Sequence, residues 1–186
     1  MFSWFKRQAQ KTQEARGEVA MEAALDAGRM IAKLEGALGG LNAAMSEDPF
    51  VVGALAAHAA ILSKVISNGQ CPISVTEAAM VQALQVSFGT QGVDRTKALG
   101  LLFQLKNHPE YTKGSQVTTL ILAARFGRRD LQGDPLLVNA RERIRSMPRA
   151  FREAFGSTEE EQISEQLSQE LLVTPLKTKY GELWRK

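Results

Sequence analysis

The chain has 186 residues, of which 44% are hydrophobic and 23% are charged, and its formal net charge is +3. These values lie close to the averages for globular proteins, so they exclude a wholly disordered chain and a fibrous repeat. The length suits one helical domain over residues 1–186, with an N-terminal extension over 1–16 and a C-terminal helical extension over 157–186. The single cysteine, Cys71, excludes an internal disulfide and indicates a reducing compartment.

The first predicted element is a long helix over about residues 3–45, or two helices joined near Gly17, because the segment lacks proline and is rich in strong helix formers. Small residues recur in it at every fourth position: Ala20, Ala24, Gly28, Ala32, Gly36, Gly40 and Ala44. A row with so little side chain lets another helix approach closely. We therefore predict that these seven residues form a helix-packing ridge.

The second predicted helix begins after a cap within Ser46, Glu47 and Asp48, has Pro49 in its first turn, and runs to about Ser67, where Asn68 and Gly69 close it. Residues 49–63 carry no acidic or basic side chain other than a histidine, but this stretch is shorter than the roughly 20 residues of a membrane span. We interpret it as a buried helix. Its own small residues make it the expected partner of the first ridge in a long antiparallel hairpin.

The remaining helices are predicted from caps and from apolar residues at helical spacing. Ser74 with Glu77 and Ser157 with Glu160 have the spacing of capping boxes, and Asp94 opens another helix. Few stretches alternate with the period of a strand. The sequence therefore predicts an all-α fold, a helical bundle of about six to eight helices with a long N-terminal helical hairpin.

Eight arginines lie between Arg125 and Arg152 with only three acidic residues, and residues 153–170 then carry six glutamates and no basic residue. Guanidinium groups suit planar, bidentate binding of carboxylate or phosphate. Seven of the arginines are predicted to bind an anionic partner: Arg125, Arg128, Arg129, Arg141, Arg145, Arg149 and Arg152. If the helix continues past Pro148, three of them share a face opposite the apolar residues: Arg141, Arg145 and Arg149. In the alternative interpretation the arginines are solvated and pair with the neighbouring glutamates.

The N-terminal segment combines aromatic and basic side chains in Phe2, Trp4, Phe5, Lys6 and Arg7. This composition is typical of a short segment that lies at a membrane interface. The alternative is that the aromatic residues cover the edge of the helical core.

The residues available for catalysis are few. His58 lies among alanines, and we expect a core histidine bonded to a carbonyl group. Two carboxylate pairs at helical spacing, Glu22 with Asp26 and Glu161 with Glu165, have no histidine joined to either in the sequence. Neither a Glu-x-x-His metal motif nor a phosphate-binding loop is present. We expect no enzyme, no metal site and no cofactor.

Together these patterns favour a cytoplasmic, non-enzymatic binding or adaptor protein. We expect it to engage a macromolecular partner, a protein in the first place, through helix faces that include the arginine-rich surface. Nucleic-acid binding by the region Arg125–Arg152 is the first alternative. Peripheral attachment at the inner face of a membrane through the N-terminal segment is the second. Small residues on both faces of the first helix also favour a homodimer.

Overall fold

The computed structural model describes residues 2–40, 43–128 and 131–180, with side chains described from residue 11 onward. All regular elements in these ranges are helical, and the predicted all-α bundle is confirmed. In chain order they include α1 (Phe2–Leu38), η1 (Ala43–Glu47), α2 (Pro49–Ile66), α3 (Ile73–Phe88), η2 (Gly89–Gln91), α4 (Arg95–Leu105), α5 (Pro109–Arg125), α6 (Pro135–Ser146), α7 (Arg149–Arg152), α8 (Glu159–Ser168), the π-helical turn η4 (Gln169–Val173) and α9 (Thr174–Tyr180).

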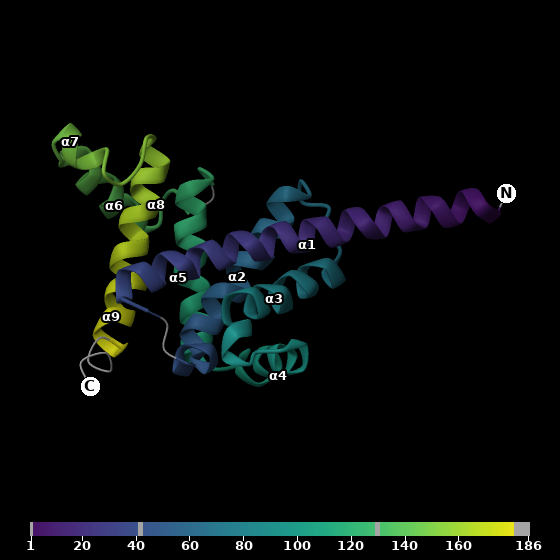
Figure 1. Ribbon diagram of the computed structural model, residues 1–186. Coiled ribbons are helices and arrows are strands. Elements are labelled where there is room, and N and C mark those ends of the chain that lie inside the picture. The colour runs from purple at the N-terminus through teal and green to yellow at the C-terminus, as the bar shows by residue number, and fades with distance from the viewer. Residues whose placement is uncertain (1, 41–42, 129–130, 181–186) are drawn as a thin grey trace.

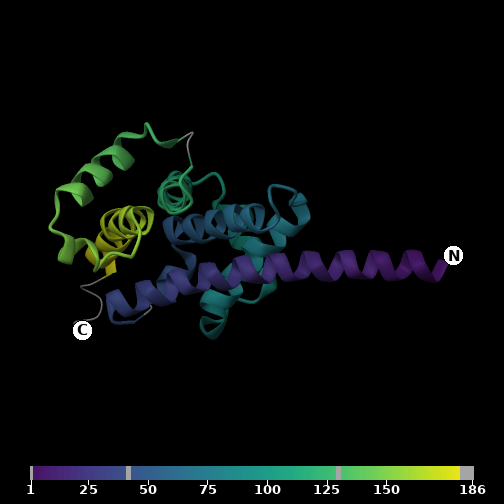
Figure 2. The same cartoon turned by 90° about the horizontal axis from the view of Figure 1, so that it is seen from above.

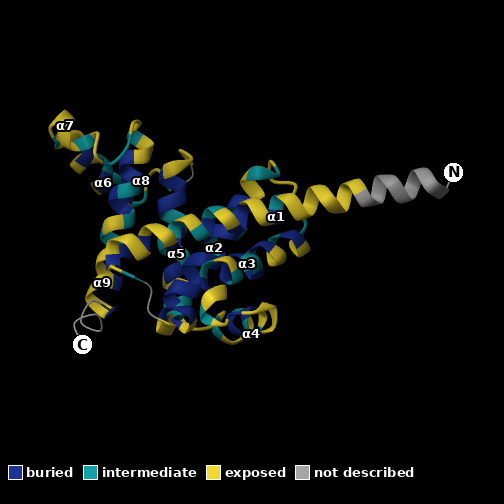
Figure 3. Ribbon diagram, in the orientation of Figure 1, coloured by how far each residue is buried: buried dark blue, intermediate teal, exposed yellow. Residues whose placement is uncertain are grey.

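Helix α1 is one continuous helix of 37 residues, about 55 Å long. Its N-terminal part projects beyond the other helices (Figures 1 and 2), and residues 11–18 are all exposed (Figure 3). The helix ends at Leu38 rather than near residue 45, because Gly39 and Gly40 adopt φ angles of 80° and 143°. These positive φ angles end a right-handed helix and favour glycine.

Only the first half of the predicted ridge is a packing surface. Ala20 and Ala24 are buried, whereas Ala32 and Gly36 are exposed. A step of four residues advances the side chain by about 40° around a straight helix, so a strict row of such steps turns away from its neighbour. The buried face instead alternates steps of four and three through Ala20, Ala24, Ala27, Ile31, Leu34 and Leu38, and Ala23 lies beside this row. Gly40 and Ala44 lie beyond the end of α1, so their assignment to the ridge is wrong.

The long N-terminal hairpin is not confirmed. Helix α1 does contact α2, but α1 packs more extensively on α3, and the main partner of α2 is α5. Gly28 of α1 faces α3, because an ideal Cβ there would lie only 2.8 Å from Cγ1 of Val86. Nothing lies within 4 Å of an ideal Cβ on Gly36, so this glycine makes no close contact with another helix of the described chain.

Helices α2 and α5 approach each other closely at two glycines. An ideal Cβ on Gly53 would overlap the carbonyl oxygen of Tyr111, and one on Gly114 would overlap the carbonyl oxygen of Phe50. The second Cβ would also lie 3.0 Å from the backbone nitrogen of Ala54. Small residues thus bring two backbones together in this fold, but the helices concerned are α2 and α5.

Helix α2 is the central helix of the core. By length and composition it could cross a membrane, but most of it is buried in the fold, which confirms the predicted buried helix (Figure 3). Asp48, the last residue of the predicted cap, is the N-cap, and its carboxylate accepts a hydrogen bond from the Phe50 backbone N–H at 2.8 Å. The same carboxylate accepts hydrogen bonds from Lys179 and Tyr180, which ties α9 to the start of α2.

Two predicted capping boxes are wrong in position. Helix α3 begins at Ile73, directly after Pro72, which supplies no side-chain cap, so Ser74 already lies inside the helix. At the start of α8 the capping box consists of Thr158 with Glu161, one residue later than predicted. The predicted cap at Asp94 is confirmed, since its carboxylate accepts the Lys97 N–H at 2.8 Å.

We predict that Gly114→Ala lowers the free energy of unfolding by about 2–3 kcal/mol, because the added methyl group would force α2 and α5 apart. Gly100→Ala in α4 is the control, since nothing lies within 4 Å of its ideal Cβ. That control should be neutral or stabilising by up to about 1 kcal/mol. Urea denaturation of both variants measures the difference, and equal stability of the two would contradict the close contact.

Candidate functional site

The predicted arginines do not share one helix face. Helix α6 ends at Ser146, and the extended backbone at Met147 and Pro148 separates it from α7, so Arg149 lies on a different helix from Arg141 and Arg145. Arg141 follows the buried Leu137 by one turn and is itself half-buried. It therefore lies beside the apolar face of α6, and the predicted opposite placement is wrong.

Several arginines pair with carboxylates of the protein itself. The pairs are Arg125 with Asp26 at 3.2 Å, Arg143 with Glu170 at 2.8 Å, Arg145 with Glu159 at 2.5 Å and Arg149 with Glu153 at 2.7 Å. All four arginine side chains are well exposed to solvent, so these pairs add little to the stability of the fold. The alternative interpretation, in which arginines pair with the glutamates of residues 153–170, describes the last three pairs.

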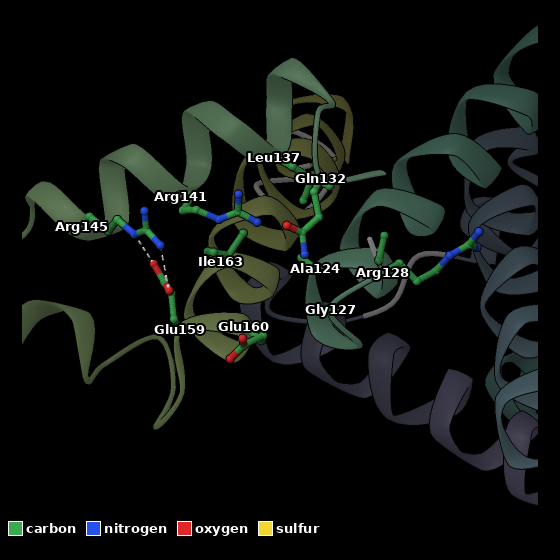
Figure 4. Close-up of a pocket in the computed structure, with 11 residues that line it drawn as sticks. Ala124, Gly127, Arg128, Gln132, Leu137, Arg141, Arg145, Glu159, Glu160 and Ile163 are labelled. Carbon is green, nitrogen blue, oxygen red and sulfur yellow. Dashed lines mark hydrogen bonds and ion pairs between the residues drawn. The ribbon is translucent and has the colours of Figure 1, made fainter. Parts of the chain in front are cut away.

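Three predicted arginines nevertheless meet at one pocket of about 240 Å³ between α5, α6 and α8, which we call the arginine pocket. Its lining comprises Ala123, Ala124, Gly127, Arg128, Gln132, Leu137, Arg141, Arg145, Glu159, Glu160 and Ile163. Figure 4 shows the Arg141 guanidinium beside Ile163, on the side that faces Gln132, while Arg145 and Glu159 lie at one edge. Among the described residues, no carboxylate lies within ion-pair distance of Arg141.

The arginine pocket is rich in hydrogen-bond donors. The Arg145 guanidinium, bonded to Glu159, lowers the pKa of that carboxyl, and the nearby charges of Arg141 and Arg152 lower it further. Glu159 is thus held as an anion by the arginines around it. The Glu159 carboxylate pairs with Arg145, and within the described part of the chain the Arg141 guanidinium makes no ion pair.

The other predicted site residues lie elsewhere. Arg129 falls outside the described residues, and Arg152 is half-buried in α7 with its Nε lacking a hydrogen-bond partner. The membrane-interface candidates, Phe2, Trp4, Phe5, Lys6 and Arg7, belong to α1 by their backbone, but their side chains are outside the described part of the chain.

A second cavity, of about 430 Å³, lies between α1, α2, α5 and α8, and we call it the His58 cleft. Its lining comprises Asp26, Arg29, Met30, Lys33, His58, Ile121, Leu122, Arg125, Phe155, Gly156, Glu161, Ser164, Glu165 and Ser168. Helices α5 and α8 line both cavities with different faces, so their contact separates the two.

The prediction for His58 is wrong in its partner. Its Nε2 lies 2.9 Å from Oδ2 of Asp26, so a carboxylate rather than a carbonyl group holds the ring. The same contact joins a histidine to the pair Glu22 and Asp26, which the sequence had left without one. The other ring nitrogen, Nδ1, is buried and has no hydrogen-bond partner. Leaving a buried polar atom without a hydrogen bond lowers the stability of the fold by about 1–3 kcal/mol. Such unsatisfied atoms call for an explanation, and a binding site is one.

Asp26 is the centre of this charge cluster. Besides His58, its carboxylate accepts hydrogen bonds from Arg125 at 3.2 Å and from Arg29 at 3.4 Å. The hydrogen bond from His58, together with the charges of His58 and Arg125, lowers the pKa of Asp26 from 3.8 to about 2. No local motif indicates this cluster, because His58 and Arg125 lie 32 and 99 residues from Asp26 in the chain.

Among the described residues, no group of three or more histidine, cysteine and acidic side chains is arranged to hold a metal ion. No family model, curated protein or solved structure matches this chain. The roles of the two cavities therefore have to be inferred from their own geometry.

We predict that Asp26→Asn lowers the free energy of unfolding by about 2 kcal/mol near pH 5, where the native carboxylate is charged. Because the pKa of Asp26 is lower in the folded state, this stability is complete above the unfolded value of 3.8 and is lost as the pH falls towards 2. The difference in the free energy of unfolding between wild type and variant, measured by urea denaturation, should therefore disappear over that pH range. Glu22→Gln, one turn earlier on α1, is the control, and a gap that stayed constant down to about pH 2 would contradict the cluster.

Proposed function

We propose that the protein is a non-enzymatic helical binding protein that holds an acidic segment of a protein partner at the arginine pocket. The observation that supports this most is the half-buried Arg141 guanidinium, which faces the pocket and has no carboxylate partner among the residues that the structure describes. A guanidinium presents five N–H donors in a fixed plane and binds a carboxylate through two of them. An aspartate or glutamate side chain of a partner would supply the missing anion.

The apolar part of the pocket favours a peptide over other anions. Leu137 and Ile163 are buried residues in the lining, and Ala123 and Ala124 lie on the α5 side. In a peptide with an acidic residue next to an apolar one, the acidic side chain would therefore contact Arg141 and the apolar side chain would contact the apolar part of the lining. Partner recognition by a small number of such anchors is common at protein interfaces.

The charges around the pocket disfavour the nucleic-acid alternative. Glu159 and Glu160 lie on its edge and interrupt the basic surface, so the pocket could hold a single carboxylate but offers no run of cations for successive phosphates. Duplex DNA also carries about one charge per 1.7 Å, so it needs a continuous basic surface, whereas several of the arginines are already paired with carboxylates.

Binding of a fluorescent peptide of alternating glutamate and leucine tests this proposal. We predict that Arg141→Gln weakens peptide binding about tenfold, as expected for loss of a charge-assisted bidentate contact. Arg149→Gln is the control, because Arg149 is paired with Glu153 outside the pocket. Equal loss in both variants, or tighter binding of a 20-nucleotide DNA with a steep salt dependence, would contradict an acidic protein partner.

A second interaction surface is supported by α1, where we propose that two copies of the chain meet. Met21 and Leu25 are 43% and 46% exposed, and the exposed Ala32 and Gly36 continue the same side of the helix. An antiparallel pair of α1 helices would set Met21 of each chain against Gly36 of the other, and Leu25 against Ala32.

We predict that Leu25→Glu shifts the chain from dimer to monomer in sedimentation equilibrium, because it places a charge in the shared apolar stripe. Phe103→Glu is the control, since Phe103 is an exposed apolar residue of α4 outside the stripe. A wild-type chain that stays monomeric at about 100 µM would overturn the dimer. Liposome flotation that is lost on removal of residues 2–7 would instead support the membrane alternative for the same helix.

A further inference from the structure

The His58 cleft lies outside the surfaces used above, and its size suits a small molecule. A volume of about 430 Å³ falls in the range of ligand pockets. Four helices contribute to it, and its lining combines apolar side chains with charged ones. Such clefts with convergent polar groups are common binding sites.

The acceptor groups of the cleft are already occupied by the protein. The Asp26 carboxylate accepts hydrogen bonds from three side chains. The Glu161 carboxylate accepts hydrogen bonds from Ser157 and Thr158 at the start of α8. Glu165 accepts one from Lys33 at 3.4 Å and one from a glutamine at 3.2 Å.

The donors of the cleft, by contrast, are in excess. Arg29 and Arg125 each donate one of their five N–H groups to a protein acceptor, and Lys33 donates one of three, within the described part of the chain. These three side chains are 77%, 46% and 76% exposed, whereas Asp26 is 19% exposed. The cations therefore lie towards the solvent, and a ligand that enters the cleft meets donors first.

The apolar lining defines the rest of the ligand. Ile121 and Leu122 of α5 are buried, and Met30 and Phe155 are half-buried beside them. His58 adds a buried Nδ1 that no protein group satisfies. The cleft thus offers cationic donors near its mouth and apolar surface further in.

We propose that the His58 cleft binds a small organic carboxylate with an apolar body. Its anionic head is held by the guanidinium groups of Arg29 and Arg125 and by the ammonium of Lys33. Its apolar body lies against Ile121, Leu122 and Phe155. This binding is independent of the arginine pocket, because the two cavities use different faces of α5 and α8.

Titration of the protein with hexanoate, followed by two-dimensional NMR of the backbone amides, tests this proposal. We expect saturable shifts at low millimolar concentration that are largest for Ile121, Leu122 and His58. Acetate should bind more weakly because it lacks the apolar body, and hexylamine should not bind because it lacks the anion. No saturable shift up to about 20 mM hexanoate, or equal affinity for inorganic phosphate, would overturn the proposal.

Matched charge variants on α1 test the role of the donors. The double variant Arg29→Gln with Lys33→Gln should weaken hexanoate binding at least about fivefold. The double variant Lys11→Gln with Arg16→Gln removes the same charge from the same helix outside the cleft, and it should bind as the wild type does. Arg141→Gln, which alters the arginine pocket, should also leave hexanoate binding unchanged. Equal weakening in the cleft variant and either control would mean that the cleft is not the site.

Discussion

The fold depends on the close contact between α2 and α5, where Gly53 and Gly114 each face a backbone carbonyl group of the other helix. This contact sets the position of α5 against α2, and α5 lines both cavities. His58 lies little more than one turn after Gly53 on α2, and Arg125 ends α5, so the close approach of these helices brings both residues to the same cleft. Helix α8 then packs on α5, and the successive residues Leu122 and Ala123 line different cavities.

Local sequence patterns predicted the helices well, because caps and apolar spacing act within one or two turns. The cap at Asp94 and the end of α2 at Ile66, just before Asn68 with its φ of 52°, are examples. The capping box at Ser157 failed because the next residue, Thr158, can cap the helix equally well, whereas the one at Ser74 failed because α3 begins after Pro72 without a side-chain cap. The ridge on α1 failed for a geometric reason, since a four-residue period does not stay on one side of a straight helix.

The candidate sites were predicted in part. The arginine-rich segment was visible as a composition, and Arg128, Arg141 and Arg145 do come together. The sequence could not indicate which arginines are paired within the protein, because Glu170 reaches Arg143 across 27 residues. The His58 cleft depends on contacts between even more distant segments, and the alanines around His58 indicated only that the ring is buried.

Native-state hydrogen exchange tests the central role of the α2 and α5 contact most directly. Amides that open only on global unfolding exchange most slowly, so they identify the most stable unit of a fold. We expect the slowest amides to lie in α2 and α5 around Gly53 and Gly114. Exchange should be faster in the part of α1 that spans residues 11–18, all of which are exposed. If the slowest amides lay in α1 and α8 instead, while those of α2 and α5 exchanged by local opening, this contact would not be the foundation of the structure.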